Sequence, residues 1–245
     1  MLRPGKKFYK RPSLIAATVV LLIAFLTVPT ALVLTARAVE KAAAKELHKA
    51  VADANIEQVK LLISGGAKVD GRDERGQTPL HLAAKYGLKD VAELLLTKGG
   101  DAKAFDNNGD TPLHLAAVGH VGVAELLTAN GATVHAKNEQ GMTPLYYAGN
   151  KDVAGFLIGK GADIYARRDY DGWTPLHYAA AHGYTDVVEL FIAKGVDVDT
   201  TNNWGVTPLD LALWAYYPDV ERILLGAKGI EKSVDLWPSK EKAKK

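Results

Sequence analysis

The 245-residue sequence contains no cysteine. It therefore excludes a disulfide, a thiolate nucleophile, and zinc or iron–sulfur sites built on cysteine. Residues 1–38 contain no aspartate or glutamate but hold six of the 30 lysines and arginines. Residues 39–245 thus carry 24 basic and 28 acidic side chains, a net charge of −4. An acidic body lacks the basic face that nucleic acids require, so we expect no nucleic-acid partner.

Charged residues are also missing between Arg11 and Arg37, where residues 14–34 are almost continuously apolar. As a helix, these 21 residues would rise about 31 Å at about 1.5 Å per residue, enough for a hydrocarbon core of roughly 30 Å. We therefore predict a membrane segment at residues 14–36, with its apolar run over 14–34, preceded by a basic tail at residues 1–13.

Two interpretations of this segment stay open. It is an uncleaved signal anchor, or it is a signal peptide cleaved near Ala38, after the small-x-small tripeptide Ala36-Arg37-Ala38. Five basic residues precede it, and positive charge tends to stay in the cytoplasm. An anchor would be a single-pass segment with a cytoplasmic N-terminus and the rest of the chain on the non-cytoplasmic side. Cleavage would release a periplasmic or secreted protein.

The rest of the chain is an internal repeat. Thr-Pro-Leu recurs at residues 78–80, 111–113, 143–145, 174–176 and 207–209, in steps of 33, 32, 31 and 33 residues. Each copy continues with small residues, a second apolar segment and a glycine. Thr fits a helix N-cap and Pro fits the first helical position. Leu80, Ala83 and Ala84 share one helix face, and so do Val91, Leu94 and Leu95. The unit is therefore a pair of short helices that ends at glycine.

This pattern resembles the ankyrin repeat, whose signature is Thr-Pro-Leu-His-x-Ala in units of about 33 residues. Residues 78–83 match it fully, as do the copies that begin at Thr111 and Thr174. A degenerate first copy aligns His48 with His81, which gives six repeats. The resemblance implies an all-α ankyrin repeat solenoid of helix-turn-helix units with β-turn tips. The apolar segment before it predicts one N-terminal hydrophobic helix. We divide the domain at residues 39–230 into repeats 45–73, 74–106, 107–138, 139–169, 170–202 and 203–230, followed by a Lys-rich tail at 231–245.

Two copies depart from the common length. The fourth lacks three residues between Ala148 and Val153, so we expect an abbreviated turn between its helices and a local irregularity in the stack. One extra residue, at Arg167-Arg168, partly restores the register.

The sequence offers little chemistry. His81, His114 and His177 recur at steps of 33 and 63 residues, but neighbouring repeats lie about 10 Å apart, too far to share a metal ion at about 2 Å. The resemblance implies that this histidine hydrogen-bonds the turn and the helix start. Residues 155–161 have the wrong spacing for a phosphate loop, and His-Glu-x-x-His and Gly-x-Ser-x-Gly are absent. We therefore expect no enzyme, cofactor, metal or small-molecule substrate.

The resemblance places a protein partner on the concave face, which consists of the turn tips and the exposed side of each first helix. Aromatic side chains are preferred anchors at such surfaces. The candidate partner-binding residues are Tyr86, Tyr170, Trp173, Trp204, Arg75, Gln77, Asn108, Asp110, Met142 and His182. We predict a non-enzymatic interaction scaffold held at, or exported across, a membrane. The alternative is a periplasmic accessory or inhibitor subunit of one enzyme.

Overall fold

The computed structural model describes residues 38–228. Residues 38–43 belong to one compact unit and residues 44–228 to another. The basic tail, the apolar segment at residues 14–36 and the Lys-rich tail at 231–245 lie outside the described residues. No helix within residues 38–228 is both long enough and apolar enough to span a bilayer.

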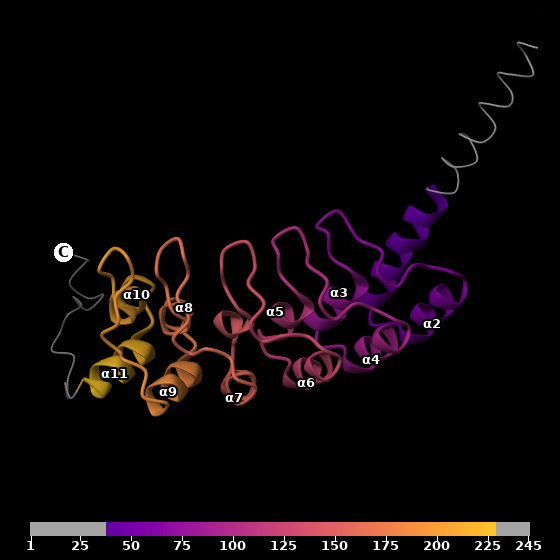
Figure 1. Cartoon of the computed structure of the whole chain (residues 1–245). Coiled ribbons are helices and arrows are strands. Elements are labelled where there is room, and N and C mark those ends of the chain that lie inside the picture. Colours follow the sequence, from indigo (N-terminus) through magenta and orange to yellow (C-terminus); the bar gives the residue numbers. More distant parts are fainter. Residues whose placement is uncertain (1–37, 229–245) are drawn as a thin grey trace, which may run out of the picture. The chain divides into compact units, whose positions relative to one another are not determined.

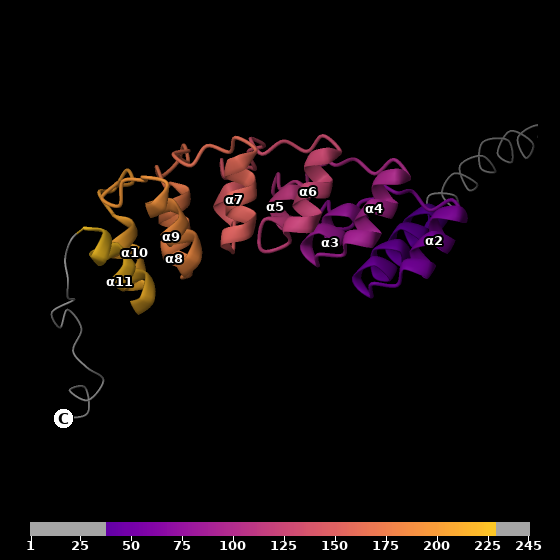
Figure 2. The ribbon, with the colours of Figure 1, turned by 90° about the horizontal axis from the view of Figure 1, so that it is seen from below.

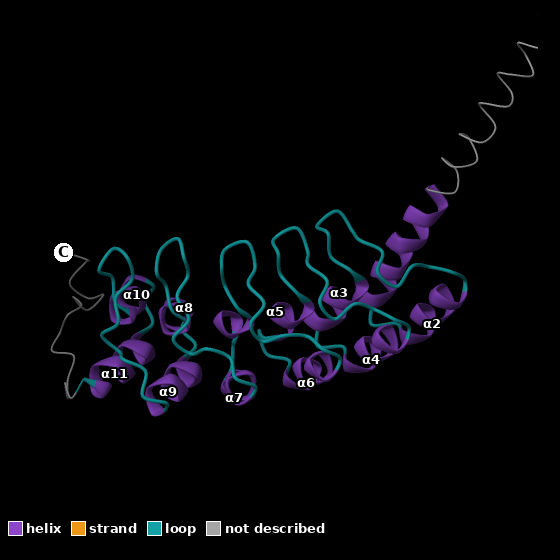
Figure 3. Cartoon of the chain, viewed as in Figure 1, coloured by secondary structure: helices purple, strands orange, loops and turns teal. Residues whose placement is uncertain are grey.

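Residues 44–228 form helix pairs that follow one another in chain order, with loops but no strand in this part of the chain (Figures 1 and 3). The first helix runs over residues 38–52. The others are α2 (Ile56–Ser64), α3 (Pro79–Lys85), α4 (Lys89–Thr97), α5 (Pro112–Ala116), α6 (Val121–Ala129), the 3₁₀ helix η1 (Pro144–Tyr147), α7 (Lys151–Gly159), α8 (Pro175–His182), α9 (Thr185–Ala193), α10 (Pro208–Trp214) and α11 (Pro218–Ala227).

The view in Figure 2 shows the second helix of each pair, from α2 to α11, succeeding one another along the array. This arrangement confirms the predicted all-α fold of paired helices.

The apolar helix faces form the core between neighbouring pairs. Leu80, Ala83 and Ala84 have no exposed surface, and Leu95 of the second helix is equally buried, whereas Leu94 is only half-buried. Burying one leucine contributes roughly 1.5–3 kcal/mol. A single helix pair cannot cover both of its apolar faces, so each repeat depends on its neighbours.

In three of the repeats, a histidine joins the cap of its own helix to the next repeat. His81 Nδ1 accepts from the backbone N–H of Thr78 (3.1 Å) and lies 2.8 Å from the Thr78 hydroxyl. His81 Nε2 lies 3.0 Å from the carbonyl of Asp110, in the next repeat. A carbonyl only accepts, so Nε2 carries the proton and the ring is neutral. Burial lowers the pKa of His81 below 6.5, which favours this form.

Equivalent hydrogen bonds join most of the neighbouring repeats, and we call this series the ladder. Each bond of the ladder ends on the backbone carbonyl of the residue that directly precedes the Thr-Pro of the next repeat. The further donors are His114 to Met142 (3.0 Å), Tyr146 to Trp173 (2.8 Å) and His177 to Val206 (3.1 Å). In the first repeat, His48 meets two carbonyls, Ala44 at 2.7 Å and Gln77 at 2.8 Å. Both contacts are hydrogen bonds only when both ring nitrogens are protonated.

Tyr146 forms the hydrogen bond to the next repeat, but it does not cap its own helix as the histidines do. Its hydroxyl donates toward the carbonyls of Trp173 and Ala166, both at 2.8 Å. Burial raises the pKa of this hydroxyl well above its ordinary value of 10, so it stays a donor. The ring has no nitrogen for Thr143, whose hydroxyl is buried without a hydrogen-bond partner among the described residues.

The fourth repeat is shortened in its first helix and not in the turn that follows, so the predicted abbreviated turn is wrong. Helix η1 has four residues against seven in α3, and its link to α7 spans residues 148–150, as long as the link 86–88. Helix α7 must align with the second helices of its neighbours to bury Val153 and Leu157. This requirement fixes the length of the link that precedes it. Gly149 is required there because a Cβ atom would overlap the carbonyl of Val118.

Replacing Tyr146 with Phe removes the hydroxyl that contacts the half-buried carbonyls of Ala166 and Trp173. The Trp173 carbonyl keeps the N–H of Arg168 as a donor, whereas the Ala166 carbonyl loses its donor. We therefore expect Tyr146→Phe to lower the free energy of unfolding by roughly 1–3 kcal/mol, the usual cost of leaving one such group unsatisfied. Urea denaturation would measure this change. Tyr165→Phe is the matched control, because Tyr165 is 59% exposed. Equal midpoints for the two variants would contradict the role assigned to Tyr146.

Candidate partner-binding surface

The turns between repeats form a row of tips. We name them the second (residues 73–77), third (106–110), fourth (138–142), fifth (168–173) and sixth (202–206) tips. In the second tip, the Asp73 carboxylate accepts from the N–H groups of Arg75 and Gln77, both at 2.8 Å. Such a side-chain bond fixes a tight turn. Asp106, Asn138 and Asn202 hold their tips in the same way.

Backbone hydrogen bonds connect neighbouring tips. The N–H of Asn107 donates to the carbonyl of Arg75 (2.9 Å), and Glu139 donates to Asn108 (3.0 Å). The fifth and sixth tips are joined by Asn203 and Asp171 (2.8 Å). Within residues 38–228, no corresponding backbone bond joins the fourth and fifth tips. The row is therefore interrupted at one junction.

The fifth tip is one residue longer than the others. The N–H of Arg168 donates to the carbonyl of Trp173 (2.9 Å) and closes a turn of six residues, where Asp73 and Gln77 close five (3.0 Å). The extra residue thus lies inside the tip and not before it. Arg168 takes the first position and forms an ion pair with Asp171.

This ion pair replaces the usual aspartate or asparagine of the turn. Arg168 Nε donates to Asp171 (2.7 Å), and the Asp171 carboxylate also accepts from the N–H of Trp173 (3.1 Å). Burial alone would raise the pKa of Asp171, but these donors outweigh it and hold the pKa below 3.8. The guanidinium also lies 5.2 Å from the ring centre of Trp173, a cation–π contact.

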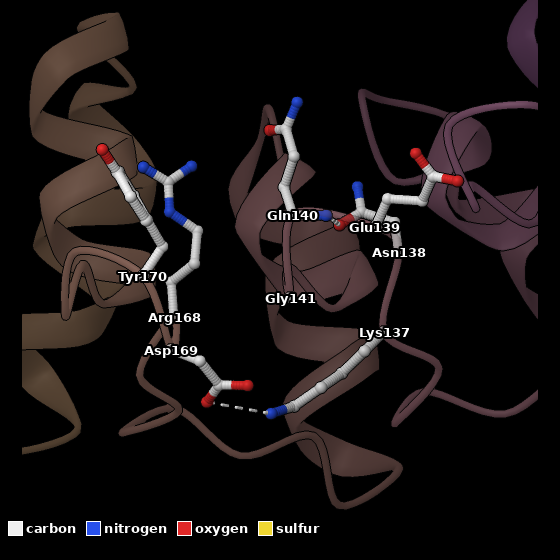
Figure 4. A pocket seen from close by; sticks show the side chains of 8 residues that line it. All are labelled: Lys137, Asn138, Glu139, Gln140, Gly141, Arg168, Asp169 and Tyr170. Carbon is white, nitrogen blue, oxygen red and sulfur yellow. Dashed lines mark hydrogen bonds and ion pairs between the residues drawn. The ribbon is translucent and has the colours of Figure 1, made fainter.

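A cleft of about 570 Å³ lies where the row of tips is interrupted. Figure 4 shows Gln140 of the fourth tip on one side and Tyr170 and Arg168 of the fifth tip on the other. Lys137 and Asp169 approach each other across its base, at 3.7 Å. Most of the residues that line the cleft are of polar type, and they include one ion pair and one aromatic ring.

An exposed aromatic pair borders this cleft. Tyr170 is 83% exposed and Trp204 is 63% exposed, and their ring centres lie 6.2 Å apart in an edge-to-face arrangement. Aromatic groups of this size bury a large area when a partner covers them. The two tips that carry them are joined by the bond from Asn203 to Asp171, so their relative position is fixed.

The structure separates the candidate residues into three groups, which are exposed, buried and half-buried. Tyr86, Tyr170 and Trp204 are exposed, and so are Arg75, Asn108 and His182. Whether these six bind a partner stays a prediction.

Gln77, Asp110 and Met142 are buried, at 7%, 6% and 3% exposure, so their placement on an accessible surface is wrong. Each directly precedes Thr-Pro, and its carbonyl accepts from the ladder of the previous repeat. That bond turns the residue inward.

Trp173 occupies the same kind of position and is half-buried. Its ring lies 6.2 Å from that of His177 in a stacked arrangement, and Arg168 covers it. Its indole nitrogen is buried without a hydrogen-bond partner among the described residues. Trp173 is thus a packing residue in this structure and not an exposed anchor.

The residues that sequence reasoning missed are those of the cleft, above all Lys137, Arg168 and Asp169. The available signal was the extra residue between Ala166 and Thr174, which predicts an atypical tip. The sequence does not indicate that this tip pairs Arg168 with Asp171 and separates from its neighbour.

The repeat geometry and the ladder define a class of protein, and comparison with known proteins identifies it. Residues 47–138 and 149–235 match the family described as ankyrin repeats (3 copies). The chain belongs to the ankyrin repeat family.

Its curated relatives are diverse proteins that share repeats with it. Protein phosphatase 1 regulatory subunit 27 of Homo sapiens is 45% identical over 64 residues, 26% of this chain and 41% of that protein. The potassium channel KOR1 of Oryza sativa subsp. japonica is 46% identical over 158 residues, 64% of this chain and 18% of the channel. Serine/threonine-protein kinase 12 of Arabidopsis thaliana is 41% identical over 81 residues, 32% and 17% of the two chains. The matched regions therefore span less than half of each relative.

Removing the Arg168 guanidinium would leave the Asp171 carboxylate, whose side chain is 3% exposed, without its charged partner. We expect Arg168→Gln to lower the free energy of unfolding at pH 7 by roughly 1–3 kcal/mol, as for a lost hydrogen bond to a charged group. Because the folded pKa of Asp171 is lowered, this contribution is present above about pH 3.8 and is lost as the pH falls through the folded pKa. The difference in free energy of unfolding between Arg168→Gln and the wild type should therefore become smaller as the pH falls.

Denaturant unfolding at several pH values would measure both effects. Arg222→Gln is the control, because its ion pair with Asp219 is 76% and 69% exposed and should contribute little. Equal losses for the two arginine variants at pH 7 would contradict the structural role of Arg168.

Proposed function

We propose that this chain is a non-enzymatic protein-binding module that holds a protein partner against its tips and the exposed sides of its first helices, at or across a membrane. The observation that carries the proposal is the exposed Tyr170–Trp204 pair on two tips that are hydrogen-bonded to each other. A few buried aromatic anchors commonly supply most of the binding energy of an interface.

The rigidity of the tips supports this proposal. The side-chain bonds of Asn202 and Asp171 hold their turns, and the backbone bond from Asn203 holds the two tips together. A surface that is ordered before the partner arrives loses little conformational entropy on binding. More of the contact energy then appears as affinity.

The proposed membrane attachment rests on the sequence. Residues 14–34 are apolar and uncharged, and five basic residues precede them. We propose a single-pass segment with a cytoplasmic N-terminus and the repeats on the non-cytoplasmic side. A tether of this kind would raise the local concentration of membrane-resident partners.

A second candidate is an accessory or inhibitor subunit that binds one enzyme after its leader is cleaved near Ala38. It is favoured by the similarity to protein phosphatase 1 regulatory subunit 27, since that protein is named for regulating an enzyme. The two candidates share the binding surface. They differ in whether the chain stays in the membrane and in whether its partner is an enzyme.

Site-specific photo-cross-linking would test the binding surface. A photoreactive phenylalanine analogue at position 170 in the full chain should cross-link a defined protein in intact cells. The same analogue at position 165 is the control, because Tyr165 is 59% exposed but lies outside the tips. We expect Trp204→Ala to reduce the cross-link at position 170 by tenfold or more, as for loss of an anchor that contributes about 2 kcal/mol. Equal products from positions 170 and 165 would contradict the proposal.

The absence of cysteine makes the topology directly measurable. Single cysteines introduced by Gly5→Cys and Ser64→Cys would be reacted with a membrane-impermeant maleimide in intact cells. We expect labelling at position 64 and protection at position 5 until the cells are lysed, because the basic N-terminus stays in the cytoplasm.

The opposite labelling would overturn the proposed orientation. Loss of position 5 from the mature chain, with release of the rest from alkali-washed membranes, would show leader cleavage and favour the second candidate.

A further inference from the structure

At two junctions between tips, a carboxamide of the chain lies over the glycine of the preceding tip. Asn107 Nδ2 donates to the carbonyl of Glu74 (3.1 Å), and a Cβ atom on Gly76 would overlap the carboxamide oxygen of Asn107. The fifth and sixth tips repeat this arrangement with Asn203, the carbonyl of Tyr170 (3.2 Å) and Gly172. In these tips, glycine leaves room for a planar amide.

The junction between the fourth and fifth tips lacks this carboxamide. Asp169 occupies the position of Asn107 and Asn203, but its carboxylate has no N–H group to donate. It faces Lys137 at 3.7 Å instead. Among the described residues, no hydrogen bond reaches the carbonyls of Glu139 and Gln140 or uses the backbone N–H of Asp169. Donors and acceptors for an amide are therefore present on both sides of the cleft.

Gly141 provides the corresponding space. Its φ of 75° matches the 74° of Gly76. The nearest atoms to a Cβ atom on Gly141 are Arg168 Cγ and the nitrogen of Asp169, both at 3.7 Å, which is ordinary van der Waals contact. The surface over Gly141 therefore has the shape that a carboxamide covers at Gly76, without a side chain of the described residues lying that close.

The charges of the cleft favour a neutral occupant. Lys137 faces Asp169, and Arg168 is paired with Asp171. The Glu139 carboxylate points away from Arg168 and Tyr170 in Figure 4. A charged ligand would have to compete with these existing pairs, whereas a neutral amide would use only the unbonded backbone groups.

We propose that the cleft binds the carboxamide side chain of a glutamine or asparagine in an extended segment of the protein partner, over Gly141 and beside Tyr170. The ligand amide donates to the carbonyl of Glu139 or Gln140 and accepts from the N–H of Asp169. It thereby completes the row of tips in the way that Asn107 and Asn203 do elsewhere. This inference rests on the proposed function, because it names the chemistry by which the partner is recognised.

The test uses the full chain, kept in solution with a non-ionic detergent, and two small probes. N-acetylglutamine methylamide carries the carboxamide, and N-acetylglutamate methylamide has the same shape with a carboxylate. Amide NMR shifts of the ¹⁵N-labelled chain report binding, and the Asp169 signal reports the predicted bond. We expect saturable binding of the glutamine probe, about three- to tenfold tighter than the glutamate probe, as for one net hydrogen bond.

Gly141→Asn would place the chain's own carboxamide in the cleft and should abolish the shift at Asp169. Asparagine tolerates positive φ better than most residues. Gly205→Asn is the matched control, with a φ of 76° and no atom within 4 Å of the Cβ position, and it should leave binding unchanged. Equal or tighter binding of the glutamate probe, or an unchanged shift in Gly141→Asn, would overturn the proposal.

The cross-link from position 170 separates this inference from the proposed function. A partner that cross-links equally well to the wild type and to Gly141→Asn would refute the carboxamide site and leave the binding function intact. Probe binding at Asp169 without any protein cross-linked at position 170 would refute the function instead. A cross-link that is lost in Gly141→Asn and retained in Gly205→Asn would support both.

Discussion

The array depends on a hydrogen bond that leaves the first helix of one repeat and ends on the carbonyl just before the first helix of the next. The donor is the far side of a buried ring, such as His81 Nε2 on the carbonyl of Asp110 at 3.0 Å. The near side of the same ring accepts from the helix cap at Thr78. One side chain thus fixes a helix start, a tip and the spacing between repeats. Apolar burial supplies most of the stability, but this bond sets the register in which the apolar faces meet.

The junction between the fourth and fifth repeats differs from the others in the donor of its ladder bond and in the length of its tip. Tyr146 replaces histidine, and its hydroxyl contacts the carbonyl of Trp173 across the junction as well as that of Ala166 in its own repeat. The cost is the unsatisfied hydroxyl of Thr143. On the tip side, the longer fifth tip is held by Arg168 and Asp171, and the backbone bond between tips is missing. The core is continuous across the junction while the tips separate, which creates a polar cleft on an otherwise regular surface.

Most of the fold could be predicted because it follows from local rules repeated along the chain. The spacing of Thr-Pro-Leu, the apolar faces around Leu80 and the capping threonines each predict the same helix pair. The shortened first helix could not be located from length alone. A deletion between Ala148 and Val153 fits either a shorter turn or a shorter helix. The choice depends on the register of Val153 and Leu157 in the core, and this register is a tertiary property.

The candidate surface was less predictable, since exposure depends on which face of a tip the ladder turns inward. Tyr170 and Trp204 are exposed as expected, whereas Gln77, Asp110 and Met142 are drawn in by the bonds to their carbonyls. All three directly precede Thr-Pro, but their residue types do not show that this position is buried, because a bond to a backbone carbonyl does not depend on the side chain. Arg168 shows the same limitation. The sequence predicts an extra residue at Arg167-Arg168, whereas in the structure Arg168 is the first residue of the longer tip and holds it through Asp171.

The last repeat carries an aspartate, Asp210, at the position where other repeats carry the donor of the ladder. Asp210 accepts from the backbone and hydroxyl of Thr207, at 2.8 and 2.7 Å, as histidine does in other repeats. An ionised carboxylate has no proton to pass on to a further carbonyl. A further repeat stacked on the last one would therefore receive no hydrogen bond from position 210. Within the described residues, position 210 is therefore where the series of donors ends, and changing this aspartate to histidine would supply the donor that a further repeat requires.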